Sequence, residues 1–348
     1  MLPDDPTPGA FMKAVAYRKA GPIDRDDALQ DITLDLPEAQ GRDLLVRVHA
    51  VSVNPVDTKI RAAREPESGA WGVLGWDAVG VVEAVGPDAR NFRPGDAVFY
   101  AGAIDRPGTN SEYHLVDERI VGRKPVALSD AEAAALPLTA ITAWEMLFDR
   151  LDVTRPPPQG GGVILVIGGA GGVGSITLQL LRALTDLTVI ATASRPETRD
   201  WARACGAHHL IDHREPLAPQ IQALGLGAPG FVFSTTQTAR HYEAIVELIA
   251  PQGRFGLIDD PGSIDLSLLK PKSVSLHWEF MYTRSLFGTP DMDAQGRLLN
   301  EIAALADAGR IKTTLTEAAG KIDAATLKRV HAQIESGKAR GKIVLEGF

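Results

Sequence analysis

The chain has 348 residues, of which 45% are hydrophobic and 23% are charged, and these proportions are typical of folded globular domains. The net charge of −8 gives no general attraction to nucleic acid or to an anionic membrane surface. The single cysteine, Cys205, excludes an intrachain disulfide and any zinc site built on two cysteines. We therefore expect no nucleic-acid partner and no membrane partner.

The first residues, 1–11, are acidic and rich in proline, which is the reverse of a signal peptide. We expect them to form a loose extension before the first strand. No apolar run approaches the roughly 20 residues that a membrane-spanning helix needs. These features predict a cytoplasmic protein.

Up to residue 125 the sequence is typical of short strands separated by turns, with almost no helical periodicity. The strands that we expect are 13–17, 43–51, 76–85, 97–101, 111–116 and 120–125. The pattern changes at Ser129, which fits a capping box with Glu132 and predicts the start of a helix. A second helix is expected over 140–150, and residues 155–162 are typical of a surface loop.

Strands and helices then alternate, which predicts a parallel sheet with helices on both faces. The expected strands are 163–167, 187–193, one near Leu210, 231–233, 254–258 and 272–281, and the expected helices are 175–184, 197–204 and 239–249. From Asp291 two helices surround a β-like segment near Thr313, and the last of them starts at Asp323 and stops at Gly337.

The closing strand, 342–346, has no neighbour in its own segment. We expect it to return to the N-terminal β unit. This predicts an α/β protein in which a doubly wound Rossmann domain, residues 129–309, is inserted into a mostly β catalytic domain formed by 1–128 and 310–348.

A glycine-rich loop gives the strongest functional signal. Gly169, Gly171 and Gly174 satisfy the pattern G-x-G-x-x-G between an apolar strand and an amphipathic helix, as a dinucleotide pyrophosphate requires. The helix N-terminus supplies N–H donors and partial positive charge. The cofactor-binding residues predicted here are Gly169, Ala170, Gly171, Gly172, Val173 and Gly174. The alternative is a flexible glycine hinge.

The segment after the second strand bears on cofactor choice. An enzyme that uses NAD places Asp or Glu there to hold the ribose 2′-hydroxyl. This chain has Ser194 and Arg195, and a hydroxyl with a forked guanidinium suits a 2′-phosphate. We therefore predict NADPH as the cofactor. The alternative is that Arg195 is a solvated loop residue.

Several separated motifs resemble the medium-chain dehydrogenase/reductase superfamily, and within it the zinc-free quinone oxidoreductases. These motifs are 53–61 (VNPVDTKIR), 75–80 (GWDAVG), 93–98 (RPGDAV), the glycine loop and 341–345 (GKIVL). The stretch 277–284 (HWEFMYTR) resembles a bacterial branch called zinc-type alcohol dehydrogenase-like. The resemblance implies that the mostly β domain is GroES-like, and we expect a homodimer.

Zinc-dependent members of this superfamily carry a cysteine ligand where this chain has Asn54, and a His-Glu pair where it has Trp76 and Asp77. They also carry a four-cysteine structural lobe that this chain lacks. Catalytic zinc needs three protein ligands, and indole cannot be one of them. We therefore predict no metal site, although the eight histidines leave an unrelated site open.

The resemblance also assigns site residues. It implies that Asn54 and Asp57 face the nicotinamide cleft, with Lys59 where the family often has tyrosine. The alternative is that Asn54 and Asp57 only fix a strand-to-helix turn. Thr139 matches a threonine that touches the nicotinamide ribose or amide, and His213 matches a tyrosine that contacts the cofactor phosphates. The remaining predicted cofactor contacts are Leu257 and Ile258, at the end of a sheet strand, and Lys342.

These observations predict hydride transfer from NADPH to a small-molecule quinone or α,β-unsaturated carbonyl without catalytic zinc. Such substrates delocalise the incoming charge, which suits a metal-free site. Lys59, Tyr282 and Arg284 are candidates for the proton donor. Two alternatives stay open: a zinc-type alcohol dehydrogenase, and a non-enzymatic NADPH-binding protein.

Overall fold

A computed structural model describes residues 11–348 of the chain, which form two compact units. The first unit runs to Leu138 and also contains Tyr282–Gly309 and Thr313–Phe348. The second comprises Thr139–Met281 and Arg310–Lys312. Of the predicted N-terminal extension, residues 1–10 lie outside the described part, and Phe11 already belongs to the first strand.

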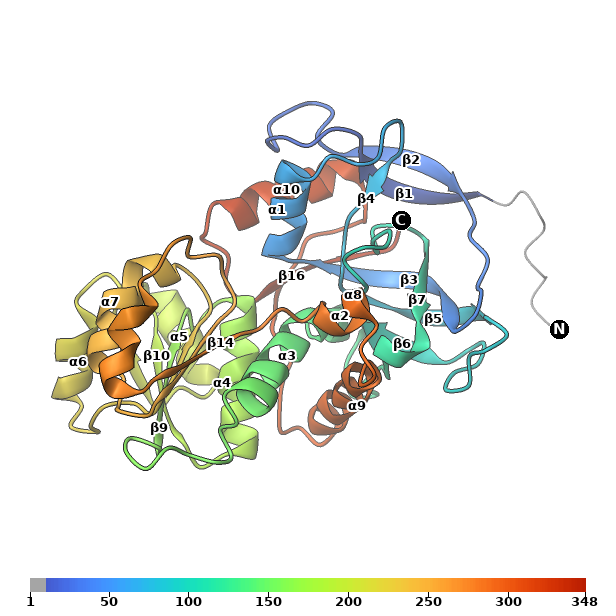
Figure 1. Cartoon of the computed structure of the whole chain (residues 1–348). Helices are drawn as coiled ribbons and strands as arrows, with labels where there is room; N and C mark the ends of the chain where they lie inside the picture. Colours follow the sequence, from blue (N-terminus) through green and yellow to red (C-terminus); the bar gives the residue numbers. More distant parts are fainter. Residues whose placement is uncertain (1–10) are drawn as a thin grey trace. The chain divides into compact units, whose positions relative to one another are not determined.

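Two sheets build the first unit (Figure 1). The smaller sheet has the order β2-β1-β4, and the larger has the order β15-β16-β3-β5-β6-β8, with β7 paired to β3. The strands are β1 (Phe11–Tyr17), β2 (Gln30–Asp35), β3 (Asp43–Val53), β4 (Gly72–Val73), β5 (Ala78–Val85), β6 (Ala97–Tyr100), β7 (Tyr113–Asp117), β8 (Val121–Arg123), β15 (Leu315–Ala318) and β16 (Lys342–Glu346). The helices are α1 (Pro55–Ala63), η1 (Glu118–Ile120), α2 (Asp130–Ala134), α8 (Thr283–Phe287), α9 (Ala294–Asp307) and α10 (Ala324–Glu335).

The closing strand β16 pairs antiparallel with β3, with Ile343 opposite Val53 and Val344 opposite Ser52. The prediction that the chain returns to its N-terminal β unit is therefore confirmed. The predicted capping box of Ser129 and Glu132 is also confirmed at the start of α2.

The second unit holds one six-stranded parallel sheet with the order β11-β10-β9-β12-β13-β14. Counted from β9, this is the order 3-2-1-4-5-6 of a doubly wound dinucleotide-binding sheet. The strands are β9 (Val163–Ile167), β10 (Thr188–Thr192), β11 (His209–Ile211), β12 (Phe231–Ser234), β13 (Arg254–Leu257) and β14 (Ser275–Trp278). The helices are α3 (Pro137–Trp144), η2 (Glu145–Arg150), α4 (Gly172–Leu184), α5 (Pro196–Ala204), α6 (Leu217–Ala223), α7 (Thr238–Leu248) and η3 (Leu266–Lys272). The predicted Rossmann sheet is confirmed.

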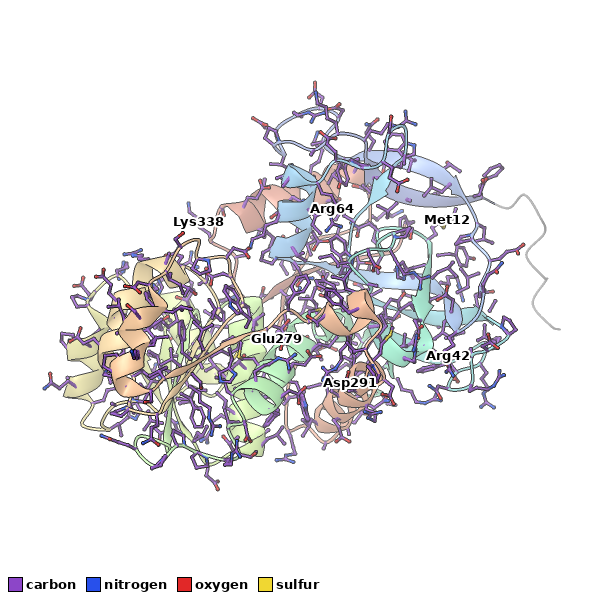
Figure 2. All side chains as sticks on the ribbon, viewed as in Figure 1. Met12, Arg42, Arg64, Glu279, Asp291 and Lys338 are labelled. Atoms are coloured by element: carbon purple, nitrogen blue, oxygen red, sulfur yellow. The ribbon has the colours of Figure 1, made fainter. Side chains whose placement is uncertain are left out.

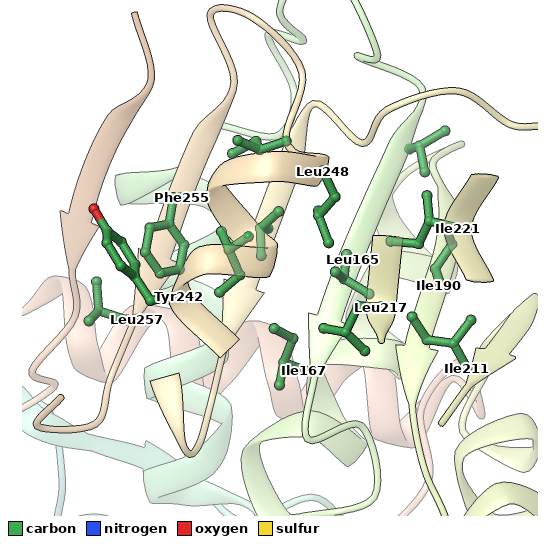
Figure 3. Close-up of a cluster of buried hydrophobic side chains, with 14 of the residues drawn as sticks. Leu165, Ile167, Ile190, Ile211, Leu217, Ile221, Tyr242, Leu248, Phe255 and Leu257 are labelled. Atoms are coloured by element: carbon green, nitrogen blue, oxygen red, sulfur yellow. The ribbon is translucent and has the colours of Figure 1, made fainter. Parts of the chain in front are cut away.

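Apolar side chains on this sheet pack against its helices (Figure 3). Leu165 and Ile190 come from the central strands, Leu217 and Ile221 come from α6, and Phe255 comes from β13. Because the central strands β9, β10 and β12 are buried on both faces, their sequences are nearly continuous apolar runs.

Three sequence-based expectations differ from the structure. The strand β2 and the helix α1 were not expected in the first 125 residues. Residues 129–138 and 282–309, expected in the Rossmann domain, belong to the first unit. The physical reason is packing: α2 contacts β3 and β5, while α9 contacts β8 and η1.

Candidate functional site

The glycine loop connects β9 to α4 in the second unit. Gly168 has a φ of +85°, a backbone conformation that favours glycine. The thirteen-residue helix α4 then begins at Gly172, so the N–H groups of Gly172, Val173 and Gly174 have no partner within the helix. This end of a helix is suited to an anion.

The glycines of the motif have different local functions. A Cβ atom on Gly174 would lie 2.2 Å from the Gly168 carbonyl oxygen, and one on Gly169 would lie 2.8 Å from Ala191 Cβ. A Cβ atom on Gly171 would meet only that same carbonyl oxygen, at the ordinary contact distance of 3.5 Å. Gly169 and Gly174 therefore permit close packing of strand and helix, whereas Gly171 leaves the space beside the helix end open. The loop fits a pyrophosphate.

We expect Gly171→Val to lose NADPH binding by about 2 kcal/mol or more, roughly 30-fold in Kd, because a side chain there intrudes on charge-assisted hydrogen bonds to the phosphates. Its melting temperature should stay within several degrees of the parent. NADPH fluorescence titration and a thermal melt measure the two quantities.

The matched variant is Gly174→Val, which should lower the melting temperature, since its Cβ atom would collide with the Gly168 carbonyl oxygen. Normal NADPH binding by Gly171→Val would show that the loop is a hinge and not a pyrophosphate site.

Basic side chains gather where β10 ends. Arg195 Nε lies 3.1 Å from Glu197 Oε1. Arg199 donates to the Ala193 carbonyl oxygen at 3.1 Å, and Arg214 donates to the Ser194 carbonyl oxygen at 3.2 Å. The guanidinium of Arg214 also lowers the pKa of Asp212 to about 2 by hydrogen bonding. Two further arginines, Arg199 and Arg214, thus lie beside the predicted pair Ser194 and Arg195.

His213 lies within this basic region. Its ring meets the ring of His241 edge-on, with the ring centroids 6.4 Å apart. Burial lowers the pKa of His213, and the positive charges of Arg240, Arg214 and Arg195 lower it further, while Asp212 opposes the shift. The structure therefore brings His213 together with Arg195, both of which the sequence predicted as cofactor contacts.

The remaining predicted contacts of the second unit are apolar or uncharged. Thr139 is buried in the first part of α3, Leu257 is the buried last residue of β13, and Ile258 follows it, half-buried. Glu279, labelled in Figure 2, was not predicted. It is buried, its backbone N–H donates to the Leu257 carbonyl oxygen at 3.1 Å, and its carboxylate lies 2.9 Å from Arg150 Nε.

A buried polar cluster lies at the centre of the first unit, around Asp77. Ser52 Oγ donates to this carboxylate at 2.7 Å, Asn54 Nδ2 at 2.8 Å, and the Leu138 backbone N–H at 2.7 Å. Lys342 Nζ completes the set at 3.1 Å. We call Ser52, Asn54, Asp77 and Lys342 the Asp77 cluster, and all of its members are at most 3% exposed.

Lys342 was predicted to bind the cofactor, and its ammonium is already engaged. It donates to the Val53 carbonyl oxygen at 3.1 Å, to Asn54 Oδ1 and to Asp77 Oδ2. A lysine has three N–H donors, so each has a partner within the first unit. This arrangement indicates a structural charge rather than a phosphate contact.

Asp57 lies beside this cluster at the start of α1. Its Oδ2 accepts the Asn54 backbone N–H at 2.7 Å, so it does fix the strand-to-helix turn. Its Oδ1 is buried and has no hydrogen-bond partner among residues 11–348. Burial raises the pKa of Asp57 to about 7, and the Asn54 amide and Lys342 only partly oppose this rise. Lys59, the other predicted catalytic residue of α1, is exposed on the opposite side of the helix.

Tyr282 and Trp76 are further members of this region. Both are 2% exposed, and their rings meet edge-on with centroids 6.2 Å apart. The Trp76 indole N–H donates to the Ala103 carbonyl oxygen at 3.1 Å. Burial raises the pKa of Tyr282 far above its ordinary value, and the charges of Asp57 and Asp77 add to the rise.

Removing the ammonium of the Asp77 cluster should be costly. We expect Lys342→Met to lower the free energy of unfolding by about 3–5 kcal/mol, because Asp77 would remain as an uncompensated buried charge. Urea unfolding of the variant and the parent gives the difference.

The control is Lys338→Met, at an exposed lysine of the same C-terminal segment (Figure 2). That change should alter the free energy of unfolding by less than about 0.5 kcal/mol. Equal effects of the two substitutions would contradict the importance of the ion pair.

Side chains at the positions of the zinc ligands do not fit a catalytic zinc. Asn54 and Asp77 bind the ammonium of Lys342, and the Trp76 indole is a donor only. Among residues 11–348, no three His, Cys, Asp or Glu side chains are grouped so that they could hold a metal ion.

None of the helices between Phe11 and Phe348 combines the length and apolar character that crossing a bilayer requires.

Comparison with known proteins assigns the family. Residues 40–126 match the alcohol dehydrogenase GroES-like domain, and residues 205–345 match the zinc-binding dehydrogenase family. A zinc-type alcohol dehydrogenase-like protein of Staphylococcus epidermidis is 37% identical over 336 residues, which cover 96% of this chain and 99% of that protein. The chain belongs to the medium-chain dehydrogenase/reductase superfamily of oxidoreductases.

Solved structures agree with this assignment. A candidate zinc-dependent alcohol dehydrogenase of Rhizobium etli CFN 42 is 62% identical, with a TM-score of 0.96 over 98% of this chain and 99% of that chain. A quinone oxidoreductase of Pseudomonas syringae is 26% identical, with a TM-score of 0.80 over 96% of this chain and 99% of that chain. The predicted combination of a GroES-like domain with a Rossmann domain is confirmed.

Proposed function

We propose that this protein is an NADPH-dependent reductase that transfers a hydride to a quinone or an α,β-unsaturated carbonyl without catalytic zinc. The observation that carries the proposal is the arginine cluster at the end of β10. Arg195, Arg199 and Arg214 lie there beside Ser194, where an NAD enzyme would hold a carboxylate for the ribose. Forked guanidinium donors suit a 2′-phosphate.

The nucleotide is held by the second unit in this proposal. The N–H groups at the start of α4 bind the pyrophosphate, and Ser194, Arg195 and His213 bind the 2′-phosphate. When bound, the nicotinamide supplies the hydride. The chain's own contribution is to position and desolvate the reactants.

The choice of substrate follows from the absence of a suitable zinc ligand set in the Asp77 cluster. Hydride addition leaves negative charge on the substrate oxygen, and a metal ion is one way to stabilise it. Here the cluster cation, Lys342, is fully engaged by Val53, Asn54 and Asp77. Quinones and conjugated carbonyls spread this charge over their own atoms. The likeness to a quinone oxidoreductase supports the same class.

The direct test is NADPH oxidation by the purified protein with a panel of quinones, enones, aldehydes and unactivated ketones. We expect turnover with the first two groups. Turnover with aldehydes and unactivated ketones alone would favour a zinc-type alcohol dehydrogenase. Tight NADPH binding without turnover of any compound would favour a non-enzymatic NADPH-binding protein.

Cofactor preference should depend on Arg195. NADPH should bind at least about tenfold more tightly than NADH, a difference of about 1.4 kcal/mol, and Arg195→Ala should erode this preference by weakening NADPH alone. Titration with both nucleotides measures it. Arg203→Ala, in the last turn of the helix α5 that Arg195 precedes, is the control. Equal affinities in the parent protein would exclude the assigned role of Arg195.

Metal analysis tests the zinc-free mechanism. Protein purified without chelator should hold less than about 0.1 zinc per chain and keep its activity in EDTA, because catalytic zinc needs three protein ligands. Stoichiometric zinc that is lost together with activity would contradict the mechanism.

A further inference from the structure

We propose that Trp201 and Ser175 are positioning residues that hold the pyrophosphate loop at a fixed distance from the 2′-phosphate segment, and that Trp201 thereby strengthens the preference for NADPH over NADH. This inference rests on the proposed function and concerns the same nucleotide site. We call the hydrogen-bonded series Trp201, Ser175 and Gly171 the Trp201 relay. All three residues belong to the second unit.

The Trp201 relay joins the helix α5 to the glycine loop. The Trp201 indole N–H donates to Ser175 Oγ at 2.8 Å. The Ser175 hydroxyl donates in turn to the Gly171 carbonyl oxygen at 2.7 Å, and the Ser175 backbone N–H donates to the same oxygen at 2.9 Å. An indole can only donate and a hydroxyl has one hydrogen, so the direction of both side-chain hydrogen bonds is fixed. Ser175 is buried, so solvent water does not compete for its hydroxyl.

The Gly171 carbonyl determines the direction of the next N–H group. In a trans peptide, the C=O and the following N–H lie in one plane and point in opposite directions. The two hydrogen bonds from Ser175 draw the Gly171 carbonyl oxygen into the first turn of α4, so the Gly172 N–H points out of the helix end. In the proposed function this N–H binds the pyrophosphate. The relay therefore orients a phosphate-binding donor.

The other end of the relay lies on the helix that follows the 2′-phosphate segment. Arg195 is the N-cap residue of α5, and its backbone N–H donates to Thr198 Oγ1 at 3.1 Å. Arg199 Nη1, also on α5, donates to the Ala193 carbonyl oxygen at 3.1 Å. The helix thus holds both neighbours of Ser194. A shift of α5 would therefore move the whole 2′-phosphate segment.

The helices α4 and α5 also meet at a second point. A Cβ atom on Gly206, just after α5, would lie 2.4 Å from Arg182 Cγ and 3.2 Å from the Leu178 carbonyl oxygen, both on α4. This close approach fixes the end of α5 against the middle and end of α4. Trp201, earlier on α5, joins the same two helices near the start of α4. The relay therefore controls how the start of α5 lies relative to the glycine loop.

The two nucleotides should respond differently to this spacing. In the proposed function NADPH makes one phosphate contact at the start of α4 and another at the start of α5. Two contacts made by one ligand reinforce each other only while the distance between their sites matches the ligand. NADH has no 2′-phosphate and does not depend on that distance. Loss of the Trp201 hydrogen bond should therefore weaken NADPH binding more than NADH binding.

The decisive variant is Trp201→Phe, which removes the indole N–H and keeps an aromatic ring. The Ser175 hydroxyl can still hold the Gly171 carbonyl. We expect the Kd for NADPH to rise about three- to tenfold, the range that one net hydrogen bond supports, and the Kd for NADH to change by less than about twofold. Ser175→Ala should weaken both nucleotides, because it also releases the Gly171 carbonyl. Fluorescence titrations with both nucleotides measure these constants.

The control is Trp71→Phe, at a tryptophan of the first unit whose ring packs under the Arg18 guanidinium at 4.2 Å. It should leave both Kd values unchanged. A purely structural Trp201 would lower the melting temperature of Trp201→Phe while the ratio of the two Kd values stays at that of the parent. That result, in a parent that prefers NADPH, would overturn the relay and leave the reductase function intact. Equal affinities in the parent would instead exclude the 2′-phosphate site, and the relay's effect on preference with it.

Nuclear magnetic resonance gives a readout that needs no nucleotide. The chain has five tryptophans, and each contributes one indole N–H signal. The signal that is missing in Trp201→Phe belongs to Trp201. In the parent it should exchange slowly with deuterium, and in Ser175→Ala it should shift and exchange faster, because its acceptor is gone. A Trp201 signal that Ser175→Ala leaves unchanged would overturn the relay.

Discussion

The buried ion pair between Lys342 and Asp77 is the interaction on which the first unit depends. Lys342 opens the closing strand β16, and Asp77 precedes β5, so one contact connects residues 265 positions apart. The same carboxylate binds the Leu138 backbone, just before the second unit begins. Burying either charge alone would be costly, and a pair so satisfied fixes register more than it adds net stability. The antiparallel register of β16 on β3 and the start of α1 are set around this pair.

Asn54 contacts both buried aspartates of this region, Asp57 and Asp77, but in different ways. Its backbone N–H serves Asp57, its side-chain amide donates to Asp77, and its carbonyl oxygen accepts from Lys342. Asp77 thereby receives several donors and a cation, whereas burial raises the pKa of Asp57 to about 7. The different contacts of these two neighbouring carboxyl groups are thus set largely by one asparagine.

Local patterns explain what the sequence could predict. The glycine loop, the apolar strands of the second unit and the capping box at Ser129 each depend on residues close together in the chain. The pairing of β16 with the N-terminal β unit could be predicted because no other expected strand lies near it in the sequence.

The helix α1 was missed because its buried face includes Asp57 and Arg61, so its sequence shows no helical period of hydrophobic residues. Lys342 lies in a motif that the sequence analysis singled out, but its partner Asp77 is 265 residues away, so no local sequence pattern indicates that the two are paired. Residues 282–309 were misassigned because packing of α9 on β8, and not sequence order, decides their unit.

The Asp77 cluster also bears on how members of one superfamily can differ in chemistry. A zinc ion polarises a carbonyl oxygen through an open coordination position. In this chain the comparable positions hold an amide, an indole and a carboxylate, and the nearby cation is an ammonium with every donor engaged. The ammonium therefore has no donor left for a substrate oxygen. In the proposed reaction, negative charge on that oxygen must then be met by the substrate's own conjugation and by a proton. The same buried ion pair that fixes the register of the first unit thus also restricts which groups of the chain remain available for a substrate oxygen.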